Sequence, residues 1–313
     1  MVKVRIRRRR RTRRQLKKQK KIIAISLIGF LFIMVGGYSA FQTNLNITAK
    51  GNIKEKSRVI QSWGQYSNED FHTDYYRENI VSATFLDDAR VPSDAVQSWD
   101  VSVDKDKGVM AYVVPNSEDS TKYDLYIGAN KGVIANEDSS RLFCNFTNIT
   151  SINFGKNFDT SNVVNMVTMF AGCNSLISLD LSFFDTKNVT SLEDIFADCF
   201  SLTTINLSGW NTSNVKNMRG LFYRNTSLTT INLRSFDTSN ITNMRAMFMG
   251  AINLTEIDLC NFDTRNVKTM MDMFANTNNL EKVIVGSNWT TANADTTNMF
   301  TNSGVSAVTT GQC

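Results

Sequence analysis

The apolar and polar positions in the C-terminal half of the chain recur with a period of 26 residues. An aromatic residue opens each unit, at Phe158, Phe184, Trp210, Phe236 and Phe262. Three further apolar positions follow the pattern L-x-x-L-x-L, first at Leu176, Leu179 and Leu181. A period in the twenties with this spacing is the signature of leucine-rich repeats, whose units stack into a coil.

Each unit is predicted to contain a short helix, a bend and a short strand. The opening aromatic is followed by Asp-Thr-Ser-Asn or a close variant, residues that cap the first turn of a helix. Apolar residues then follow at helical spacing, as at Val163, Met166, Met169 and Phe170. Methionines at this spacing fill a core much more often than they bind a metal. Strands of successive units should stack in parallel, about 4.8 Å apart.

The predicted strands present one polar face. The last two apolar residues of L-x-x-L-x-L point inward, so their neighbours along the strand point outward. These neighbours vary between units while the apolar scaffold does not, which makes the face a candidate site for a protein partner. A merely solvated sheet surface would show the same pattern. The candidate residues are Ser178, Asp180, Thr204, Asn206, Thr230, Asn232, Arg234, Glu256, Asp258 and Lys282.

Short β-prone runs precede the repeats within residues 80–132, separated by loops rich in turn-forming residues. We expect a small β-rich module that caps the apolar end of the stack, and a separate binding domain is the alternative. An imperfect first unit places the repeats at 133–303. The polar segment 42–79 is predicted to be a spacer, and residues 304–313 a C-terminal tail.

Charge divides the chain sharply. Its formal net charge is +5, yet residues 1–21 contain thirteen Lys or Arg and no acid, so the remainder is net acidic. Residues 22–41 carry no charge and, at 1.5 Å per residue, are long enough to cross a hydrocarbon core of ~30 Å. Because a basic flank holds its end of such a segment inside, we expect a cytoplasmic tail at 1–21 and extracellular repeats.

The apolar segment at 22–41 is predicted to be an uncleaved transmembrane signal anchor. Its length favours an anchor over a secretory signal, whose hydrophobic region spans ~7–15 residues. Cleavage near Ser39 or Ala40, which would release a secreted form, is the alternative. Insertion into a membrane also argues against nucleic acid as the partner of the basic tract.

The unit Phe158 to Leu181 reads F-D-T-S-N-V-V-N-M-V-T-M-F-A-G-C-N-S-L-I-S-L-D-L. It closely resembles the 26-residue repeat of bacterial surface proteins, found in BspA-like leucine-rich repeat proteins and in mycoplasma-type surface proteins. The resemblance covers about residues 133–300, and residues 98–143 also resemble the segment that precedes such repeats. It implies a surface-exposed bacterial protein that adheres to host or neighbouring cells, and it transfers no catalytic residue.

Side chains for catalysis or metal binding are sparse. His72 is the only histidine, no C-x-x-C pair occurs, and the phosphate-binding glycine motifs are missing. Asp100, Asp104 and Asp106 precede Gly108, but the closing Glu of a calcium loop is lacking, which favours a solvated hairpin. We therefore predict no enzyme, no cofactor and no metal.

The five cysteines leave their pairing open. Cys173 and Cys199 hold the same repeat position, and stacked coils would bring their Cα atoms within the ~4.4–6.8 Å of a disulfide. Small residues replace them in later units, which favours two buried thiols. Cys260 is expected to point outward and, like Cys313, to be a reactive thiol or an intermolecular link.

These patterns predict an α/β solenoid, a right-handed leucine-rich repeat coil with parallel strands and short helices, an N-terminal β-rich cap and one N-terminal transmembrane helix. The expected function is non-catalytic binding or adhesion by a membrane-anchored bacterial surface protein. Its expected partners are the membrane, through a single span, and an extracellular protein or cell-surface ligand. The alternative is a structural spacer that presents the 80–132 module.

Overall fold

The structure, a computed structural model, describes residues 55–65, 69–311 and 313. All of these belong to the second of two units, residues 1–54 and 55–313. The predicted cytoplasmic tail at 1–21 and transmembrane segment at 22–41 lie outside the described residues. In the part that the structure describes, no helix is both long and apolar enough to span a membrane. The expected single-pass membrane protein with a transmembrane helix therefore finds no support in the described residues, and this expectation is not carried further.

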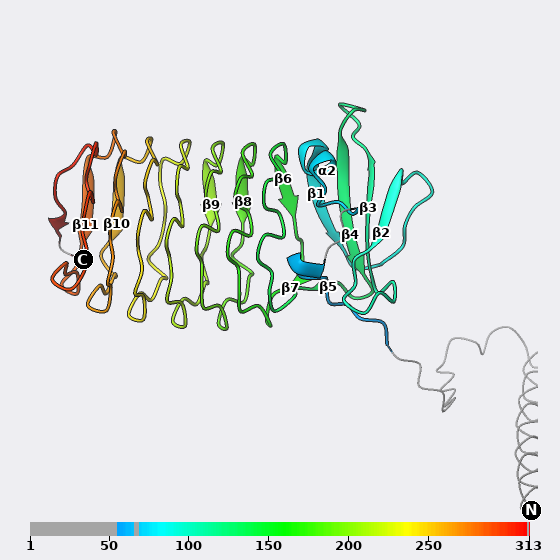
Figure 1. The fold of residues 1–313 in the computed structure, drawn as a ribbon, viewed down its shortest axis with the longest axis horizontal. Coiled ribbons are helices and arrows are strands. Elements are labelled where there is room, and N and C mark those ends of the chain that lie inside the picture. Colours follow the sequence, from blue (N-terminus) through cyan, green and yellow to red (C-terminus); the bar gives the residue numbers. More distant parts are fainter. Residues whose placement is uncertain (1–54, 66–68, 312) are drawn as a thin grey trace, which may run out of the picture. The chain divides into compact units, whose positions relative to one another are not determined.

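A five-stranded sheet opens the described chain (Figure 1). Its strands are, in spatial order, β2 (Gln97–Asp100), β3 (Val109–Pro115), β4 (Tyr123–Ala129), β1 (Ile80–Leu86) and β6 (Ser151–Asn153). Strand β3 pairs antiparallel with β2 and β4, whereas β1 pairs parallel with β4 and β6. Because β6 comes from the imperfect first repeat, the strands of residues 80–132 share one sheet with the repeats and do not form a separate domain.

Residues 55–65 and 69–79, predicted to be part of a spacer, pack against this sheet. They include a 3₁₀ helix, η1 (Trp63–Gln65), and a helix, α2 (Asp74–Asn79), capped by the Thr73 side chain. Ile60 and Phe71 are fully buried. The His72 Nε2 donates to the Leu142 carbonyl at 2.9 Å, and burial lowers the pKa of this imidazole. These two buried apolar side chains anchor a segment whose composition is otherwise mainly polar.

From residue 133 to residue 303, successive units form a stack of coils, here called the repeat stack (Figure 1). Its strands pair in parallel in three small sheets: β5 (Val133–Ile134) with β7 (Phe158–Asp159), β8 (Ser178–Asp180) with β9 (Thr204–Asn206), and β10 (Glu256–Leu259) with β11 (Lys282–Val285) and β12 (Thr309–Thr310). The coil between β9 and β10 has no assigned strand, so the expected sheet is interrupted. A second ladder of single parallel bridges runs from Asp138 to Asp295.

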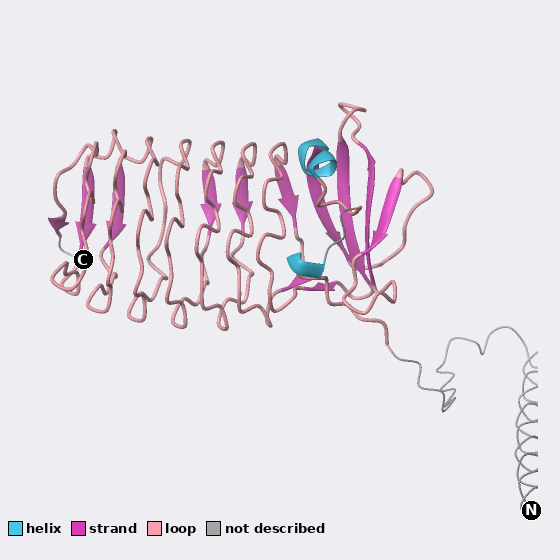
Figure 2. Cartoon of the chain, in the orientation of Figure 1, coloured by secondary structure: helices cyan, strands magenta, loops and turns pink. Residues whose placement is uncertain are grey.

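The predicted α/β solenoid is wrong, because the described chain consists mostly of small sheets and loops with almost no helix (Figure 2). Where helices were expected, each unit contains two residues with positive φ, four positions apart. A right-handed helix does not accommodate such residues. The pairs are Thr168 and Gly172, Asp194 and Asp198, Gly220 and Arg224, Ala246 and Gly250, Asp272 and Asn276, and Asn298 and Asn302.

Backbone hydrogen bonds in these segments alternate between the same coil and the next one. The amides of Thr168 and Phe170 donate to the Glu193 and Ile195 carbonyls of the following coil, at 2.9 and 3.0 Å. The intervening Met169 amide donates to the Met166 carbonyl three residues earlier in its own coil, at 3.2 Å. Half of the donors that an α-helix would use internally therefore join neighbouring coils.

The Asp-Thr-Ser-Asn motif also acts between coils and caps no helix. The threonine hydroxyls are buried and donate to carbonyls of the next coil at 2.7–3.4 Å, from Thr160, Thr186, Thr212, Thr238 and Thr264. The asparagine amides donate to the preceding coil at 2.7–2.9 Å, from Asn188, Asn214, Asn240 and Asn266. Each copy of the motif thus fixes its neighbours on both sides.

The core of the repeat stack is a column of stacked phenylalanine rings packed against methionines. Neighbouring ring centroids lie 5.4–5.9 Å apart along Phe143, Phe170, Phe196, Phe222, Phe248, Phe274 and Phe300. Met166 and Met169, like Met218 and Met244 of later units, are fully buried. The prediction that these methionines fill the core is confirmed.

Replacing Thr168 by asparagine is expected to raise the free energy of unfolding by about 1 kcal/mol, because the left-handed conformation costs ordinary residues ~1–2 kcal/mol and asparagine tolerates it. Thr168 is β-branched with φ +53°, and Asn298 occupies the equivalent place in the last unit. Urea unfolding followed by circular dichroism measures the change. Thr229→Asn, at an exposed position without positive φ, is the control. Equal effects of the two substitutions would contradict the strain argument.

Candidate functional site

The ten residues of the predicted polar face lie along successive coils of the repeat stack. Nine are exposed and Asp258 is half-buried. Leu179 and Leu181, their inward neighbours in the first full unit, are buried, as the alternation of strand side chains requires. The outward orientation that the sequence indicated is therefore present. The ten side chains nevertheless divide into groups with different roles.

One group caps the bend after each strand. The carboxylate or amide oxygen accepts a hydrogen bond from the backbone amide two residues later, at 3.0–3.1 Å, in Asp180, Asn206, Asn232 and Asp258. The bond from the Ser182 amide is the main reason why the pKa of Asp180 is lowered. This geometry is an Asx turn, which Asp and Asn favour. Because the D-L-S and N-L-S sequences carry this signal, a structural role could have been recognised beforehand.

A second group of five residues, here called the outer column, has no such role. It contains Ser178, Thr204, Thr230, Glu256 and Lys282. These side chains are exposed, and within the described part of the chain none forms a hydrogen bond or ion pair. Parallel pairing places Ser178 beside Thr204 and Glu256 beside Lys282. The outer column is therefore a row of side chains available to a ligand.

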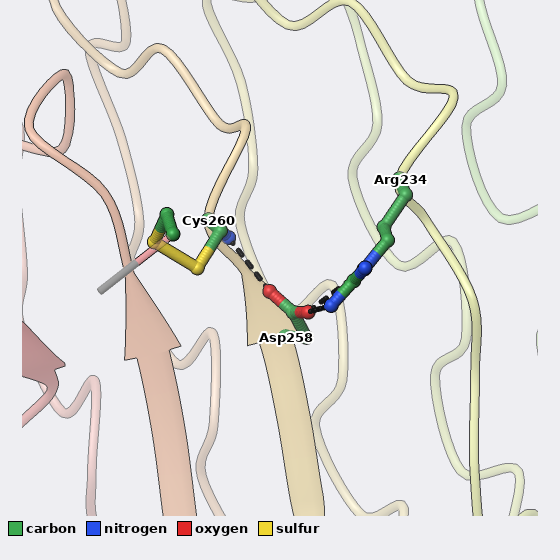
Figure 3. Close-up of a disulfide and its surroundings, with 4 residues drawn as sticks. Arg234, Asp258 and Cys260 are labelled. Carbon is green, nitrogen blue, oxygen red and sulfur yellow. Dashed lines mark hydrogen bonds and ion pairs between the residues drawn. A yellow bond between two sulfur atoms is a disulfide. The ribbon is translucent and has the colours of Figure 1, made fainter. Parts of the chain in front are cut away.

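Arg234 and Asp258 form an ion pair between two coils, drawn in Figure 3. The Arg234 Nε and Nη2 donate to Asp258 Oδ2 at 3.0 and 2.7 Å, while Asp258 Oδ1 accepts from the Cys260 amide at 3.0 Å. The hydrogen bond from the Cys260 amide is the main reason why the pKa of Asp258 is lowered. The hydrogen bond from Arg234 lowers it further. Since this carboxylate is already engaged, a ligand would meet Arg234, which is the more exposed partner.

A disulfide joins Cys260 to Cys313 across 53 positions, with Cα atoms 5.5 Å apart (Figure 3). The expectation of reactive or intermolecular thiols at these two residues is therefore wrong. The disulfide and β12 also show that residues 304–313 are not a loose tail. Sequence spacing gave no signal for this pairing, because it depends on β12 lying beside β11.

Cys173 and Cys199 are free, buried thiols. The small residues at the same repeat position in later units favoured this outcome over a disulfide. They donate to the Phe143 and Phe170 carbonyls at 3.1 and 3.2 Å. Burial raises the pKa of Cys199 to about 12 and that of Cys173 well above its usual value. These thiols are therefore poor nucleophiles, since the thiolate is the reactive form.

The acidic loop before Gly108 uses its carboxylates to hold the backbone. Asp100 accepts from the Ser102 and Lys107 amides at 3.0 and 2.9 Å. Asp106 accepts from the Ser57 and Gly108 amides at 2.8 and 3.0 Å. In the described ranges, no group of three or more His, Cys, Asp or Glu side chains has the arrangement of a metal site.

Two exposed apolar residues beside the polar face were missed by the sequence reasoning. Ile177 precedes the outer-column residue Ser178 and is 53% exposed, and Phe183 follows β8 with 44% exposed. Their places in the later units are taken by polar residues or glycine, such as Thr203 and Gly209. This departure from the repeat consensus is the signal that could have identified them.

The repeats match one described protein family. Residues 137–232 and 203–309 match the family described as "Mycoplasma protein of unknown function, DUF285", and the two segments together span more than half of the chain. No curated protein and no solved structure matches. The match fits the mycoplasma-type surface repeat that the sequence resembles, without assigning the BspA-like group. The chain therefore belongs to this Mycoplasma protein family of unknown function.

Proposed function

We propose that this chain is a non-catalytic binding protein, related to the BspA-like surface proteins, that holds an extracellular protein or cell-surface ligand on the outer column. The observation that carries the proposal is the outer column itself. Its five side chains are exposed and without partners in the described part of the chain, although they stand on a fully buried core. Side chains that stabilise nothing in the fold are available for recognition.

The rigidity of the scaffold favours such a role. Neighbouring coils are tied by alternate backbone amides and by the buried threonines, so the outer column is held at strand spacing, about 4.8 Å per coil. A ligand therefore orders few additional side chains on binding, which reduces the entropic cost of association. The outer column has hydroxyls at one end and the charges of Glu256 and Lys282 at the other, and this polar contrast can select a partner.

Exchanging the two outer-column charges tests this proposal. We expect Glu256→Lys combined with Lys282→Glu to weaken binding of the full chain about tenfold, which corresponds to ~1.4 kcal/mol. The probes are purified fibronectin, laminin and collagen, immobilised for surface plasmon resonance. Glu118→Lys combined with Lys268→Glu is the control, because it also exchanges two exposed charges and conserves the net charge.

The result is decisive in both directions. The proposal requires saturable binding to at least one probe and a selective loss in the outer-column variant. If no probe binds, or if the two double variants bind equally well, the outer column is not a binding face. Circular dichroism must show the same fold for both variants, which is expected because neither pair contacts the core.

The structural-spacer alternative is less favoured by the fold. A spacer would hold the 80–132 module as an independent unit, but β6 of the first repeat is an edge strand of the module's sheet, bonded to β1. The Thr150 amide and hydroxyl both bond to the Val81 carbonyl, at 2.8 and 3.0 Å. The module and the repeats therefore share one structure.

A further inference from the structure

A hollow of about 690 Å³ lies beside β2 and β3, the two strands of the five-stranded sheet that are farthest from β6. It is lined by residues 88–91, Ser98 and Met110, and by the two lysines Lys56 and Lys107. We call it the basic hollow. Its volume falls within the ~300–1,000 Å³ of sites for small organic ligands. The basic hollow is separate from the outer column, because the repeats join the sheet at the opposite edge, through β6.

Two glycines allow the walls of the basic hollow to approach the sheet closely. A Cβ at Gly108 would lie 1.9 Å from the Ser57 carbonyl oxygen. A Cβ at Gly128 would lie 1.9 Å from the Asp88 carbonyl oxygen. Because no side chain fits at either distance, only glycine lets these two segments lie so near the strands. The fold thus brings the segment before the sheet and the loop after β1 to the same hollow.

The contact at Gly108 places two lysines next to each other. The Asp106 Oδ2 accepts from the Ser57 amide at 2.8 Å and fixes the segment before the sheet. The Lys56 Nζ donates to the Lys107 carbonyl at 3.5 Å. Both lysines are exposed, and in the described ranges neither forms an ion pair with an acidic side chain. An anion bound between them would be stabilised by both charges.

The acidic side chain that lines the basic hollow, Asp88, is already compensated by Arg90. The Asp88 Oδ1 accepts from the Arg90 amide at 2.8 Å, and the Arg90 Nη2 donates to Asp88 Oδ2 at 3.1 Å. The bond from the amide is the main reason why the pKa of Asp88 is lowered. Three cationic side chains and one carboxylate line the hollow, so the positive charges of Lys56 and Lys107 remain uncompensated.

Met110 and Val91 add an apolar surface to this charge. Both are half-buried and line the basic hollow. The Met110 thioether is polarisable and makes favourable contacts with aromatic rings. An inorganic ion would leave this surface in water, whereas an organic group would cover it and gain from its burial. The lining therefore favours an anion that carries an apolar group.

We propose that the basic hollow binds a phosphate monoester, with the phosphate between Lys56 and Lys107 and the organic group against Met110 and Val91. A phosphate monoester carries ~1.5–2 negative charges at pH 7, which matches the two uncompensated lysines. Lysine binds phosphate as a point charge, so no bidentate geometry is needed. Charge, volume and lining residues carry the inference, which does not depend on the proposed function.

Phenyl phosphate is the probe, titrated into the full chain by isothermal titration calorimetry. We expect saturable binding with a Kd below about 1 mM. Benzenesulfonate keeps the ring and a tetrahedral anionic group but carries a single negative charge, and inorganic phosphate lacks the ring. Each of these two ligands should bind at least about fivefold more weakly than phenyl phosphate. Failure of phenyl phosphate to saturate, or an equal affinity for either comparison ligand, would overturn the proposal.

Lysine variants locate the site. Lys56→Gln and Lys107→Gln should each weaken phenyl phosphate binding at least about fivefold, and the double variant should abolish saturation. Lys216→Gln is the matched control, because it removes the charge of another exposed lysine, in the repeat stack, and should leave the affinity unchanged. All of these side chains are exposed, so circular dichroism should show an unaltered fold. Undiminished binding to the double variant, or an equal loss in Lys216→Gln, would contradict the proposal.

Discussion

Phe222→Ala is expected to lower the free energy of unfolding by about 3–5 kcal/mol, the range found for alanine in place of a buried phenylalanine. The Phe222 ring is fully buried in the middle of the phenylalanine column, 5.7 Å from Phe196 and 5.8 Å from Phe248. Its removal leaves a cavity that the neighbouring coils cannot close, because their backbones are tied at fixed spacing. Two stacking contacts are lost with it.

Phe183→Ala is the matched control for this measurement. The same atoms are deleted, but the Phe183 ring is 44% exposed, so the expected loss is about 1 kcal/mol or less. Urea unfolding followed by circular dichroism gives both values. If Phe222→Ala cost no more than Phe183→Ala, the phenylalanine column would not be the core that stabilises the repeat stack.

The period, the core and the outward face of the repeats could be predicted from the sequence, because all three depend on where apolar residues recur. Phe170 and Leu179 are buried whatever backbone conformation joins them. Burial is therefore specified by the hydrophobic effect alone. The same pattern does not specify the backbone, since positions spaced three and four apart suit both an α-helix and the alternating turns seen here.

The helices were predicted wrongly because two signals were interpreted within one coil. Asp-Thr-Ser-Asn resembles a helix cap, but the Thr186 hydroxyl bonds to the Asn211 carbonyl of the next coil. Glycine, Asp and Asn at the positive-φ positions, such as Asp194 and Asp198, were a signal against a helix. Thr168 and Ala246 at the same positions weaken that signal, because their conformation is imposed by the neighbouring coils.

Half of the candidate site could be separated from the rest only with the structure. Asp180 and Glu256 both point outward, yet the first caps a bend and the second has no partner within the described residues.

The second large effect is expected from the disulfide between Cys260 and Cys313. Its loss in Cys313→Ser should lower the free energy of unfolding by about 4 kcal/mol, from the loop-closure entropy of a 53-residue separation. The stabilisation arises because the closed loop restricts the unfolded chain, while in the folded chain the bond holds β12 against β11. A reductant such as dithiothreitol should destabilise the unmodified protein by the same amount.

Thiol variants separate this effect from a general sensitivity to reductant. Cys144→Ser changes a half-buried free cysteine and should leave both the stability and the response to dithiothreitol nearly unchanged. Cys260→Ser combined with Cys313→Ser should be as unstable as the reduced protein and indifferent to the reductant, because both conditions open the same loop. Urea unfolding with and without dithiothreitol provides the comparison. If the reductant destabilised this double variant as much as the unmodified protein, the closed loop would not be the source of the stability.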